Sequence, residues 1–350
     1  MAYNLVIVGY GGMGSYHANT ILKDNESIQV IGTFDIDEAR KAASDVDGYK
    51  TYDSYQAVLD DNAVDIILIA TPNDVHKELA IAALQAKKHV VCEKPVTIHS
   101  KELEEIMDAA IQHDRLFMVH QNRRWDEDFL TMKTIYDKNV VGNVFQIESR
   151  VHGANGIPGD WRHLKEYGGG MLLDWGVHLL DQLLVMVDSR ITSVYANLSF
   201  VLGDEVDDGF QTVITFENGI QALIEVGTTN FIQLPRWYVK GTEGTALIND
   251  WSLNGHIVTQ NRGADFEHPK PIKAGKGLTK TMAPPSEKAI TKSELPAYDS
   301  PTEGFYENVV AVIEKREEPY VKNEEVLRVM RLIEVIFEAA DKNEVIKTRL

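Results

Sequence analysis

Short apolar runs alternate with amphipathic stretches along the first third of the chain. The runs are rich in Val and Ile and apolar on both faces, as expected of parallel strands that helices cover on both sides. Asp74 and Ser100 stand where helix N-caps are expected. This alternation predicts a doubly wound α/β domain. Its strands are expected at 4–9, 28–34, 64–70, 89–92 and 116–120, and its helices at 15–22, 37–44, 55–60, 74–86 and 100–113.

The pattern changes after residue 122. Polar and apolar positions alternate in 144–151, 211–216 and 221–226, and Glu217-Asn218-Gly219 supplies a turn signal between the last two. Such hairpins favour an antiparallel sheet with one covered face. Further helices are expected at 170–187, 305–314 and 323–343. We therefore predict an α/β domain over 1–122 and an α+β domain over 123–350.

Prolines interrupt the second domain near its end. Six of the 11 prolines fall within 269–301, interspersed with Lys and Gly. This composition predicts a long surface loop or lid rather than regular structure.

Composition narrows the classes of partner. At ~150 residues per domain, 350 residues correspond to about two domains. The net charge is −18, and it is spread evenly, with 10 basic and 19 acidic residues in 1–122 and 25 and 34 in the remainder. No basic arm or stripe is evident, so we expect neither nucleic acid nor a membrane surface as a partner. A single cysteine, no apolar run near ~20 residues and no signal-peptide pattern predict a cytoplasmic protein.

A glycine-rich turn follows the first predicted strand. Gly9-Tyr10-Gly11-Gly12-Met13-Gly14 is a G-x-G-x-x-G that opens a helix. Gly9 permits a tight turn, Gly11 lets the backbone approach a pyrophosphate, and Gly14 lets helix and strand pack closely. Asp35 ends the second strand, 21 residues after Gly14, where an acid accepts hydrogen bonds from ribose hydroxyls. This favours NAD over NADP. Arg40 leaves NADP open, and a turn with glycines for packing alone is the alternative.

A lysine follows the strand at 89–92. Lys94 precedes Pro95, which excludes Lys94 from helical backbone conformations. Ligands of open α/β sheets lie outside the carboxyl ends of the strands, so Lys94 is expected to face the cofactor crevice and to serve proton transfer. The alternative is a surface lysine that pairs with Glu93.

An apolar helix with three preceding glycines carries Asp174, His178 and Asp181 on one face, at i, i+4 and i+7. Charged groups in such a helix need partners or a wet cleft. We predict that His178 is a general acid/base and that Asp174 orients it. A self-satisfied buried pair is one alternative. Metal ligation is another, but a third ligand of known spacing is missing, so no metal is expected.

Taken together, these segments resemble the Gfo/Idh/MocA oxidoreductase family, which includes inositol and sugar dehydrogenases. The resemblance covers the whole chain, and the combination of Glu-Lys-Pro with Gly-Gly-Gly…Asp-x-Gly-x-His-x-x-Asp is highly specific. The segments that carry it are 9–14, 70–73 with His76, 93–95, 122–124, 161–162 and 168–181.

The resemblance implies an N-terminal Rossmann domain and a C-terminal α+β domain with a large open, mostly antiparallel sheet. The outer face of that sheet commonly joins subunits, so a homodimer or homotetramer is expected. The Lys94–Pro95 bond is expected to be cis. The implied roles are catalysis for Lys94, Asp174 and His178; cofactor binding for Thr71, Pro72, Asn73, His76, Glu93 and the glycine loop; and substrate binding for Arg124, His152, Trp161 and Arg162.

The implied activity is hydride transfer between a secondary hydroxyl of a cyclitol, sugar or glycoside and NAD, with NADP as the second choice. Two alternatives stay open. In one, bound NAD is recycled during a redox-neutral modification of a sugar. In the other, the chain is a non-catalytic sensor or regulator on the same fold.

Overall fold

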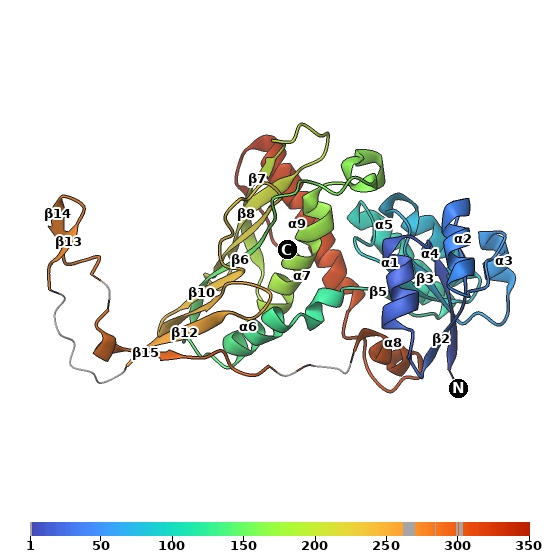
Figure 1. Cartoon of the computed structure of the whole chain (residues 1–350), viewed down its shortest axis with the longest axis horizontal. Coiled ribbons are helices and arrows are strands. Elements are labelled where there is room, and N and C mark those ends of the chain that lie inside the picture. The colour runs from blue at the N-terminus through green and yellow to red at the C-terminus, as the bar shows by residue number, and fades with distance from the viewer. Residues whose placement is uncertain (1, 262–269, 284, 299, 301–303) are drawn as a thin grey trace.

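The computed structural model describes residues 2–261, 270–283, 285–298, 300 and 304–350. They form a five-stranded parallel sheet in the order β2-β1-β3-β4-β5, with helices on both sides (Figure 1). All four residues of β3 are fully buried, which explains the unbroken apolar run. The strands are β1 Tyr3–Val8, β2 Ile28–Phe34, β3 Ile66–Ile69, β4 His89–Cys92 and β5 Phe117–Val119.

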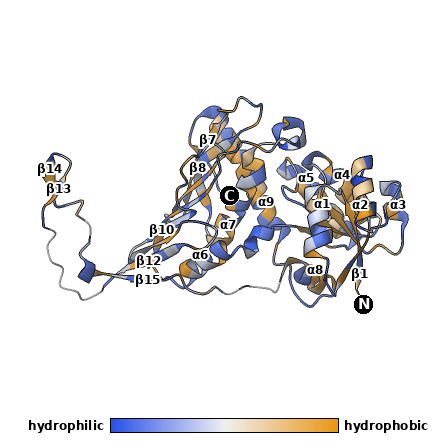
Figure 2. Ribbon diagram, in the orientation of Figure 1, coloured by the Kyte–Doolittle hydropathy of each residue, from blue (hydrophilic) through white to orange (hydrophobic). Residues whose placement is uncertain are grey.

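The register of this sheet places three strand ends side by side. Val8 pairs with Ile69, and Ile69 pairs with Cys92. The residues that follow, Gly9, Ala70 and Glu93, therefore lie together at the carboxyl edge, where ligands of such sheets bind. Figure 2 shows apolar residues concentrated on these strands.

The helices of this unit differ from expectation mainly at their starts. The first begins at Gly12 and changes to a π-helix at His17. Asp74 lies inside a 3₁₀ turn and caps nothing, and Ser100 is the first helical residue after the N-cap His99. The helices are α1 Gly12–Tyr16, the π-helix His17–Ile21, α2 Glu38–Val46, α3 Tyr55–Asp60, the 3₁₀ turn Asn73–Val75, α4 His76–Gln85 and α5 Ser100–His113.

The second sheet has nine strands in the order β15-β12-β11-β10-β6-β9-β8-β7-β16. Only β6 and β9 pair in parallel, and β8 and β9 form the expected hairpin. The fold is therefore α/β with a Rossmann-like parallel sheet and a large, mostly antiparallel sheet, as predicted. The strands are β6 Val144–His152, β7 Ile191–Ser199, β8 Gly209–Phe216, β9 Gln221–Gly227, β10 Trp237–Gly241, β11 Gly244–Ile248, β12 Gly255–Gln260, β15 Ile290–Ser293 and β16 Ile346–Lys347.

Helices cover one face of the second sheet, on the side of the first unit (Figure 1). The expected helix at 170–187 is instead a π-helix followed by α7. The face away from these helices has no helix over it in Figure 1. The helices on the covered face are α6 Glu127–Asp137, the π-helix Leu172–Gly176, α7 Val177–Met186 and α9 Asn323–Lys342.

The chain returns to the first unit near its end. Helix α8, Phe305–Ile313, lies beside α1 and β2 (Figure 1), and Asn25 donates a hydrogen bond to Glu307 at 3.1 Å. The N–H of Ser100 at the start of α5 donates to Glu334 of α9 at 2.8 Å. Segments that follow the predicted boundary at residue 122 therefore also contact the first unit.

The proline-rich segment is partly regular, which corrects the expectation of a loop or lid. Residues 262–269, 284, 299 and 301–303, which include Pro269, Pro284 and Pro301, lie outside the described part. Within it, β13 Ile272–Ala274 and β14 Gly277–Thr279 form a hairpin on an arm that points away from the first unit (Figure 1), and β15 joins the sheet. Residues 270–283 of this arm carry four lysines and no acidic residue.

Candidate functional site: the carboxyl edge of the first sheet

The glycine loop after β1 has the backbone that its sequence predicts. Gly9 has φ +95°, and a Cβ there would lie 2.6 Å from the Ala70 carbonyl oxygen. A Cβ on Gly14 would lie 1.9 Å from the Gly9 oxygen, so helix and strand meet at backbone distance. A Cβ on Gly11 or Gly12 would meet nothing within 4 Å. These two glycines therefore leave room for a pyrophosphate at the place where a motif of this kind would bind one.

Asp35 is fixed at the end of β2 beside this loop. One carboxylate oxygen accepts the N–H of Tyr10 at 2.7 Å and the other accepts the N–H of Asp37 at 2.9 Å. A carboxylate has about four lone-pair sites, so both oxygens keep acceptor capacity for ribose hydroxyls. The carboxylate thus shapes the glycine loop and stays available to a ligand.

The loop after β3 is held from behind by His76. The ring of His76 is fully buried, with Nε2 2.9 Å from the Thr71 oxygen and Nδ1 3.1 Å from the Val96 oxygen. This corrects the expectation that His76 touches the cofactor: its polar atoms are occupied by backbone, and it positions the loop. The Thr71 hydroxyl is buried and has no hydrogen-bond partner among the described residues.

Asn73 connects this loop to the second unit. Its side-chain amide donates to the Gly168 carbonyl oxygen at 3.1 Å, and Asn73 is buried. Gly168 has φ +71°, and a Cβ there would lie 3.1 Å from the Asn73 side chain. The glycine triplet is therefore a point of close approach between the two units, next to the loop expected to bind cofactor.

Lys94 reaches from the carboxyl edge of the first sheet to the π-helix of the second unit. Its ammonium donates to the Asp174 carboxylate at 3.0 Å and to the Asp174 carbonyl oxygen at 2.9 Å. The Lys94–Pro95 bond is cis, as the resemblance implied. Arg162 approaches the same carboxylate, with Nε 3.2 Å from Oδ1. Burial raises the pKa of the Asp174 carboxyl, but Lys94 and Arg162 outweigh it, and the net pKa lies below its ordinary value.

Asp174 does not orient His178, which corrects the prediction from the i, i+4 spacing. Asp174 lies in the π-helix Leu172–Gly176, whose i→i+5 pattern widens each turn, while His178 lies in the α-helix that follows. Asp174, His178 and Asp181 therefore do not share the single helix face that the sequence predicts. Asp174 contacts Lys94 and Arg162, Asp181 contacts Arg124, and Nδ1 of His178 is buried without a hydrogen-bond partner among the described residues.

The surroundings of His178 keep it neutral. Burial lowers its pKa well below the ordinary value, and the positive charges of Lys94 and Arg123 lower it further. Arg123 stacks on the ring of Trp175, 4.2 Å from its centroid, and Trp175 lies edge-on to His178. The site thus contains a neutral imidazole between two cations.

Asp207, which no motif singled out, holds the start of the π-helix. Its carboxylate accepts the N–H of Leu172 at 2.8 Å, and its carbonyl oxygen accepts the N–H of Met171 at 3.0 Å. A Cβ on Gly170 would lie 2.3 Å from the Asp207 carboxylate. Burial raises the pKa of Asp207 to about 7, although these N–H groups oppose the shift. The glycine triplet thus allows the close approach that its sequence indicated.

Glu93 is committed to a buried network, which corrects its assignment as a cofactor ligand. One oxygen lies 2.7 Å from Nε2 of His17 and 2.8 Å from Nδ1 of His120, and the other accepts the N–H of Lys94 at 3.1 Å. The hydroxyl of Tyr306 donates to Nδ1 of His17 at 2.8 Å. Burial raises the pKa of Glu93, but both histidines outweigh it and hold the pKa well below its usual range.

The ligand atoms of His17, Glu93 and His120 lie within 4.8 Å of one another, the only such group among the described residues that suits a metal ion. Short hydrogen bonds already join these atoms. His17 follows Gly14 at a G-x-x-H spacing, which is a signal that the sequence could have offered. Tyr306 lies 289 residues from His17, so no local pattern could reveal it.

Two residues expected to line the substrate pocket are internal instead. Arg124 is 1% exposed and forms a two-pronged ion pair with Asp181 at 2.6 and 2.8 Å, with a further contact of 2.6 Å to Glu325. The side chain of His152 is 2% exposed, and Nε2 lies 3.4 Å from Glu225. Both differ from the expectation, because buried polar groups take partners within the protein.

Trp161 and Arg162 do lie at the site. They form a 3₁₀ turn, Trp161–His163, that starts at Asp160, and the Arg162 guanidinium packs 4.6 Å from the Trp161 ring centroid. Asp160 pairs with Arg162 at 2.7 Å. Both side chains are partly exposed. The guanidinium therefore extends from solvent to Asp174, as a substrate-binding group would.

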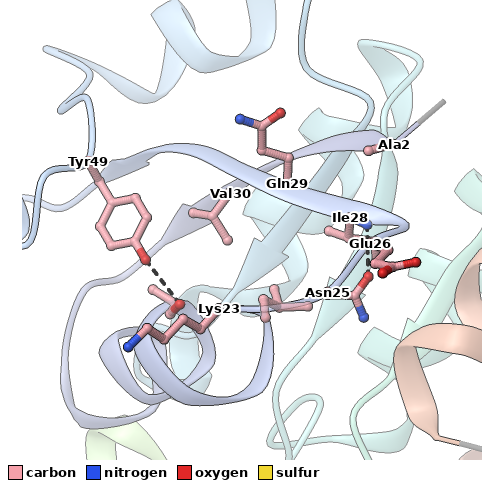
Figure 3. A pocket seen from close by; sticks show the side chains of 10 residues that line it. Ala2, Lys23, Asn25, Glu26, Ile28, Gln29, Val30 and Tyr49 are labelled. Atoms are coloured by element: carbon pink, nitrogen blue, oxygen red, sulfur yellow. Dashed lines mark hydrogen bonds between the residues drawn. The ribbon is translucent and has the colours of Figure 1, made fainter.

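A hollow of about 330 Å³ lies elsewhere on the first unit (Figure 3). Its lining includes Ala2, Ile28, Val30 and Tyr49, near the amino ends of β1 and β2. Tyr49 donates to the Ala18 oxygen at 3.0 Å across it. Ligands of open α/β sheets bind at the opposite, carboxyl edge, so this hollow is separate from the crevice described above.

The residues of the crevice fit a dinucleotide. Gly11 and Gly12 leave open space, the buried Thr71 hydroxyl lacks a partner, and Asp35 keeps acceptor capacity. The glycine loop and Asp35 would hold the adenosine half, and Thr71–Asn73 with Lys94 would line the other half.

Comparison with known proteins settles the family. Residues 3–121 match the model of the oxidoreductase family with NAD-binding Rossmann fold, and residues 129–247 match the Gfo/Idh/MocA C-terminal domain. The chain belongs to the Gfo/Idh/MocA oxidoreductase family. It is an oxidoreductase with the NAD-binding fold of that family. No helix among the described residues has the length and apolar character to cross a membrane.

Relatives within the Gfo/Idh/MocA family span most of the chain. A solved NAD-binding protein from Listeria innocua is 62% identical, with a TM-score of 0.97 and 99% coverage of both chains. An uncharacterized oxidoreductase of Schizosaccharomyces pombe, C26H5.09c, is 28% identical over 87% of this chain and 86% of its own length. The scyllo-inositol 2-dehydrogenase (NADP(+)) IolW of Bacillus subtilis is 26% identical over 97% and 94%.

Proposed function

We propose that the chain catalyses reversible hydride transfer between NAD and a secondary hydroxyl of a cyclitol, sugar or glycoside. The observation that carries this proposal is the neutral imidazole of His178 beside the Lys94–Asp174 pair. A neutral base next to a fixed cation suits removal of a hydroxyl proton. The relative named scyllo-inositol 2-dehydrogenase supports a polyol as substrate.

His178 acts as the base in this mechanism. Because its pKa lies well below the ordinary value, its imidazole is neutral at physiological pH, and one ring nitrogen can accept the hydroxyl proton. Lys94 donates a hydrogen bond to the same oxygen and stabilises the negative charge that develops on it. The bound nicotinamide supplies the hydride acceptor. In the reverse direction His178 returns the proton.

Asp174 and Arg162 position these groups. The Asp174 carboxylate fixes the Lys94 ammonium, so that Lys94 does not have to be ordered when the substrate arrives. Arg162 contacts the same carboxylate, and Trp161 lies against Arg162. A polyol offers both hydroxyl groups and apolar C–H faces, so the guanidinium and the indole together suit its recognition.

Asp35 favours NAD over NADP in this proposal. Its carboxylate lies at the end of β2, where it would accept hydrogen bonds from the ribose hydroxyls of NAD and repel the 2′-phosphate of NADP. We further propose that the chain forms a homodimer or homotetramer through the helix-free face of the nine-stranded sheet.

The test is a panel of inositols, hexoses and glycosides assayed for NADH formation, with His178→Gln as the inactive comparison. At least one substrate is expected to be oxidised by the wild-type chain and not by the variant. A chain that binds NAD and oxidises none of the panel, or a variant that retains wild-type turnover, contradicts the proposal.

A further inference from the structure

An arm projects beyond the edge strand β15 of the large sheet (Figure 1). Its described residues are 270–283, which we call the basic arm. Strands β13 and β14 of the arm pair with each other and with no other described strand. A two-stranded hairpin alone is at best marginally stable in water. A hairpin held away from its own chain is therefore a segment that another surface would stabilise.

The charge of the basic arm is opposite to that of the chain. The arm carries four lysines and no acidic residue. Since the net charge of the whole chain is −18, the residues outside the arm carry a net charge of −22. All four lysines are exposed, and none of them forms an ion pair with a described residue. The lysines are Lys270, Lys273, Lys276 and Lys280.

The basic arm also exposes apolar side chains. Leu278 is 76% exposed, Met282 is 80% exposed and Ile272 is 36% exposed. Nucleic acid matches the lysines only. An anionic membrane matches the lysines and the apolar side chains, but it would repel the acidic remainder of the chain, as nucleic acid would. The combination of cations with large apolar groups fits a protein surface that is acidic and partly apolar.

A second copy of this chain offers such a surface. Phe200 and Val201 in the β7–β8 loop are 51% and 72% exposed, and Phe231 in the β9–β10 loop is 90% exposed. The β7–β8 loop also contains Asp204, which lies 3.2 Å from Nδ1 of His163, and Glu205, which accepts the N–H of Lys165 at 3.1 Å. Residues 200–208 and 228–235 include no lysine or arginine. The arm extends on the side of the sheet away from its helices (Figure 1), where the proposed subunit contact lies.

We propose that the basic arm clasps a second copy of the chain, using its lysines and exposed apolar side chains. This inference rests on the subunit association proposed above and adds a defined segment to it. Apolar contacts of the arm supply affinity, and the lysines steer the arm to the acidic partner and set the salt dependence of association.

Crosslinking tests the clasp directly. Cys92 is the only cysteine and is buried, so Thr281→Cys gives one reactive site on the arm for a maleimide photocrosslinker. Isotopically light and heavy chains are mixed, crosslinked and analysed by mass spectrometry. Crosslinks that join light to heavy peptides are expected. Crosslinks within one chain only, or binding of the arm to added RNA or anionic vesicles without interchain crosslinks, overturn the proposal.

Charge reversal provides the second measurement. The variant Lys270→Glu/Lys273→Glu/Lys276→Glu/Lys280→Glu is compared with the matched variant that has Arg at the same positions, by sedimentation at several concentrations and salt levels. Reversal is expected to raise the dimer Kd at least about tenfold at low salt, and the Arg variant to behave as wild type. A wild-type monomer contradicts subunit association itself. A wild-type dimer whose Kd is insensitive to reversal contradicts the clasp alone.

Discussion

Lys94, which follows a strand of the first sheet, and Asp174, in a helix that covers the second sheet, meet at 3.0 Å, and the Lys94 ammonium also lies 2.9 Å from the Asp174 carbonyl oxygen. The pair joins the end of β4 to a π-helix 80 residues later in the chain. It places a fixed cation beside the neutral His178, so the two groups that the proposed chemistry requires are set before a substrate binds.

Loss of the Lys94 cation should impair turnover more than binding. For Lys94→Ala we expect kcat to fall about a hundredfold to a thousandfold, because one preorganised donor to the reacting oxygen is lost. The dissociation constant of NAD, measured by calorimetry, should change little. Lys77→Ala serves as the control, because it removes a lysine of α4 that pairs with Glu105 of α5. Unchanged turnover of Lys94→Ala would remove this lysine from the mechanism.

The pKa of His178 makes a prediction about pH. Because burial, Lys94 and Arg123 lower it well below 6.5, the base stays deprotonated as the pH falls through that value. The kcat/KM for alcohol oxidation should therefore stay level there and decline only at lower pH. In Lys94→Met one of the charges that lower the pKa is gone, so the imidazole signal of His178 should titrate at higher pH in NMR. Assignment by His178→Gln identifies that signal, and a titration midpoint equal to wild type contradicts the electrostatic account.

Asp35 predicts the choice of cofactor. In Asp35→Asn the side-chain oxygen still accepts the N–H of Tyr10, but the negative charge that repels a 2′-phosphate is lost. The ratio of the NADP and NAD dissociation constants should fall about tenfold, since a hydrogen bond to a charged group is worth ~1.5–3 kcal/mol. Titration of both cofactors measures this ratio. Tighter binding of NADP by the wild-type chain contradicts the role given to Asp35.

Asp207 should give stability an unusual dependence on pH. Its folded pKa of about 7 lies above the unfolded value, so the folded state binds more protons between them and stability falls as pH rises through that window. Asp207→Asn keeps an acceptor for the Leu172 N–H and removes the titration. As the pH rises from 4 to 8, the free energy of unfolding of the variant should increase relative to that of wild type by on the order of 3 kcal/mol. Urea unfolding at both pH values checks this, with the exposed Asp341→Asn as the control.

The Glu93 network should matter for stability. Because its folded pKa is well below the ordinary value, the ionised carboxylate stabilises the fold above the unfolded pKa, and that contribution is lost as pH falls toward the folded pKa. Glu93→Gln removes the buried charge that faces His17 and His120 and should cost about 3 kcal/mol. Denaturant unfolding measures the cost, and the exposed Glu78→Gln should cost almost nothing.

Local signals singled out the glycine loop, Asp35 and Lys94, because each depends on residues a few positions apart, and the family resemblance implied the cis bond. The spacing of Asp174, His178 and Asp181 led to the wrong prediction that Asp174 orients His178, and the reason is physical. A single π-turn rotates one part of a helix relative to the rest, and nothing in the apolar sequence of 172–176 marks where this occurs.

Contacts between distant segments explain the other differences. Arg124 is buried because Asp181 and Glu325 converge on it, the latter 201 residues away. His152 is covered because the β9–β10 loop folds over it, with the Leu234 N–H 3.3 Å from its ring. Sequence motifs identified these residues as part of the chemical segments, but only tertiary contacts decide which of them face the crevice.

The hydrogen bond between Tyr306 and His17 has a consequence for synthesis of the protein. His17 is translated 289 residues before its buried partner Tyr306. The nucleotide-binding unit therefore lacks this hydrogen bond until α8 has been made. Its final consolidation comes after translation of the second sheet, although its own strands are translated before that sheet.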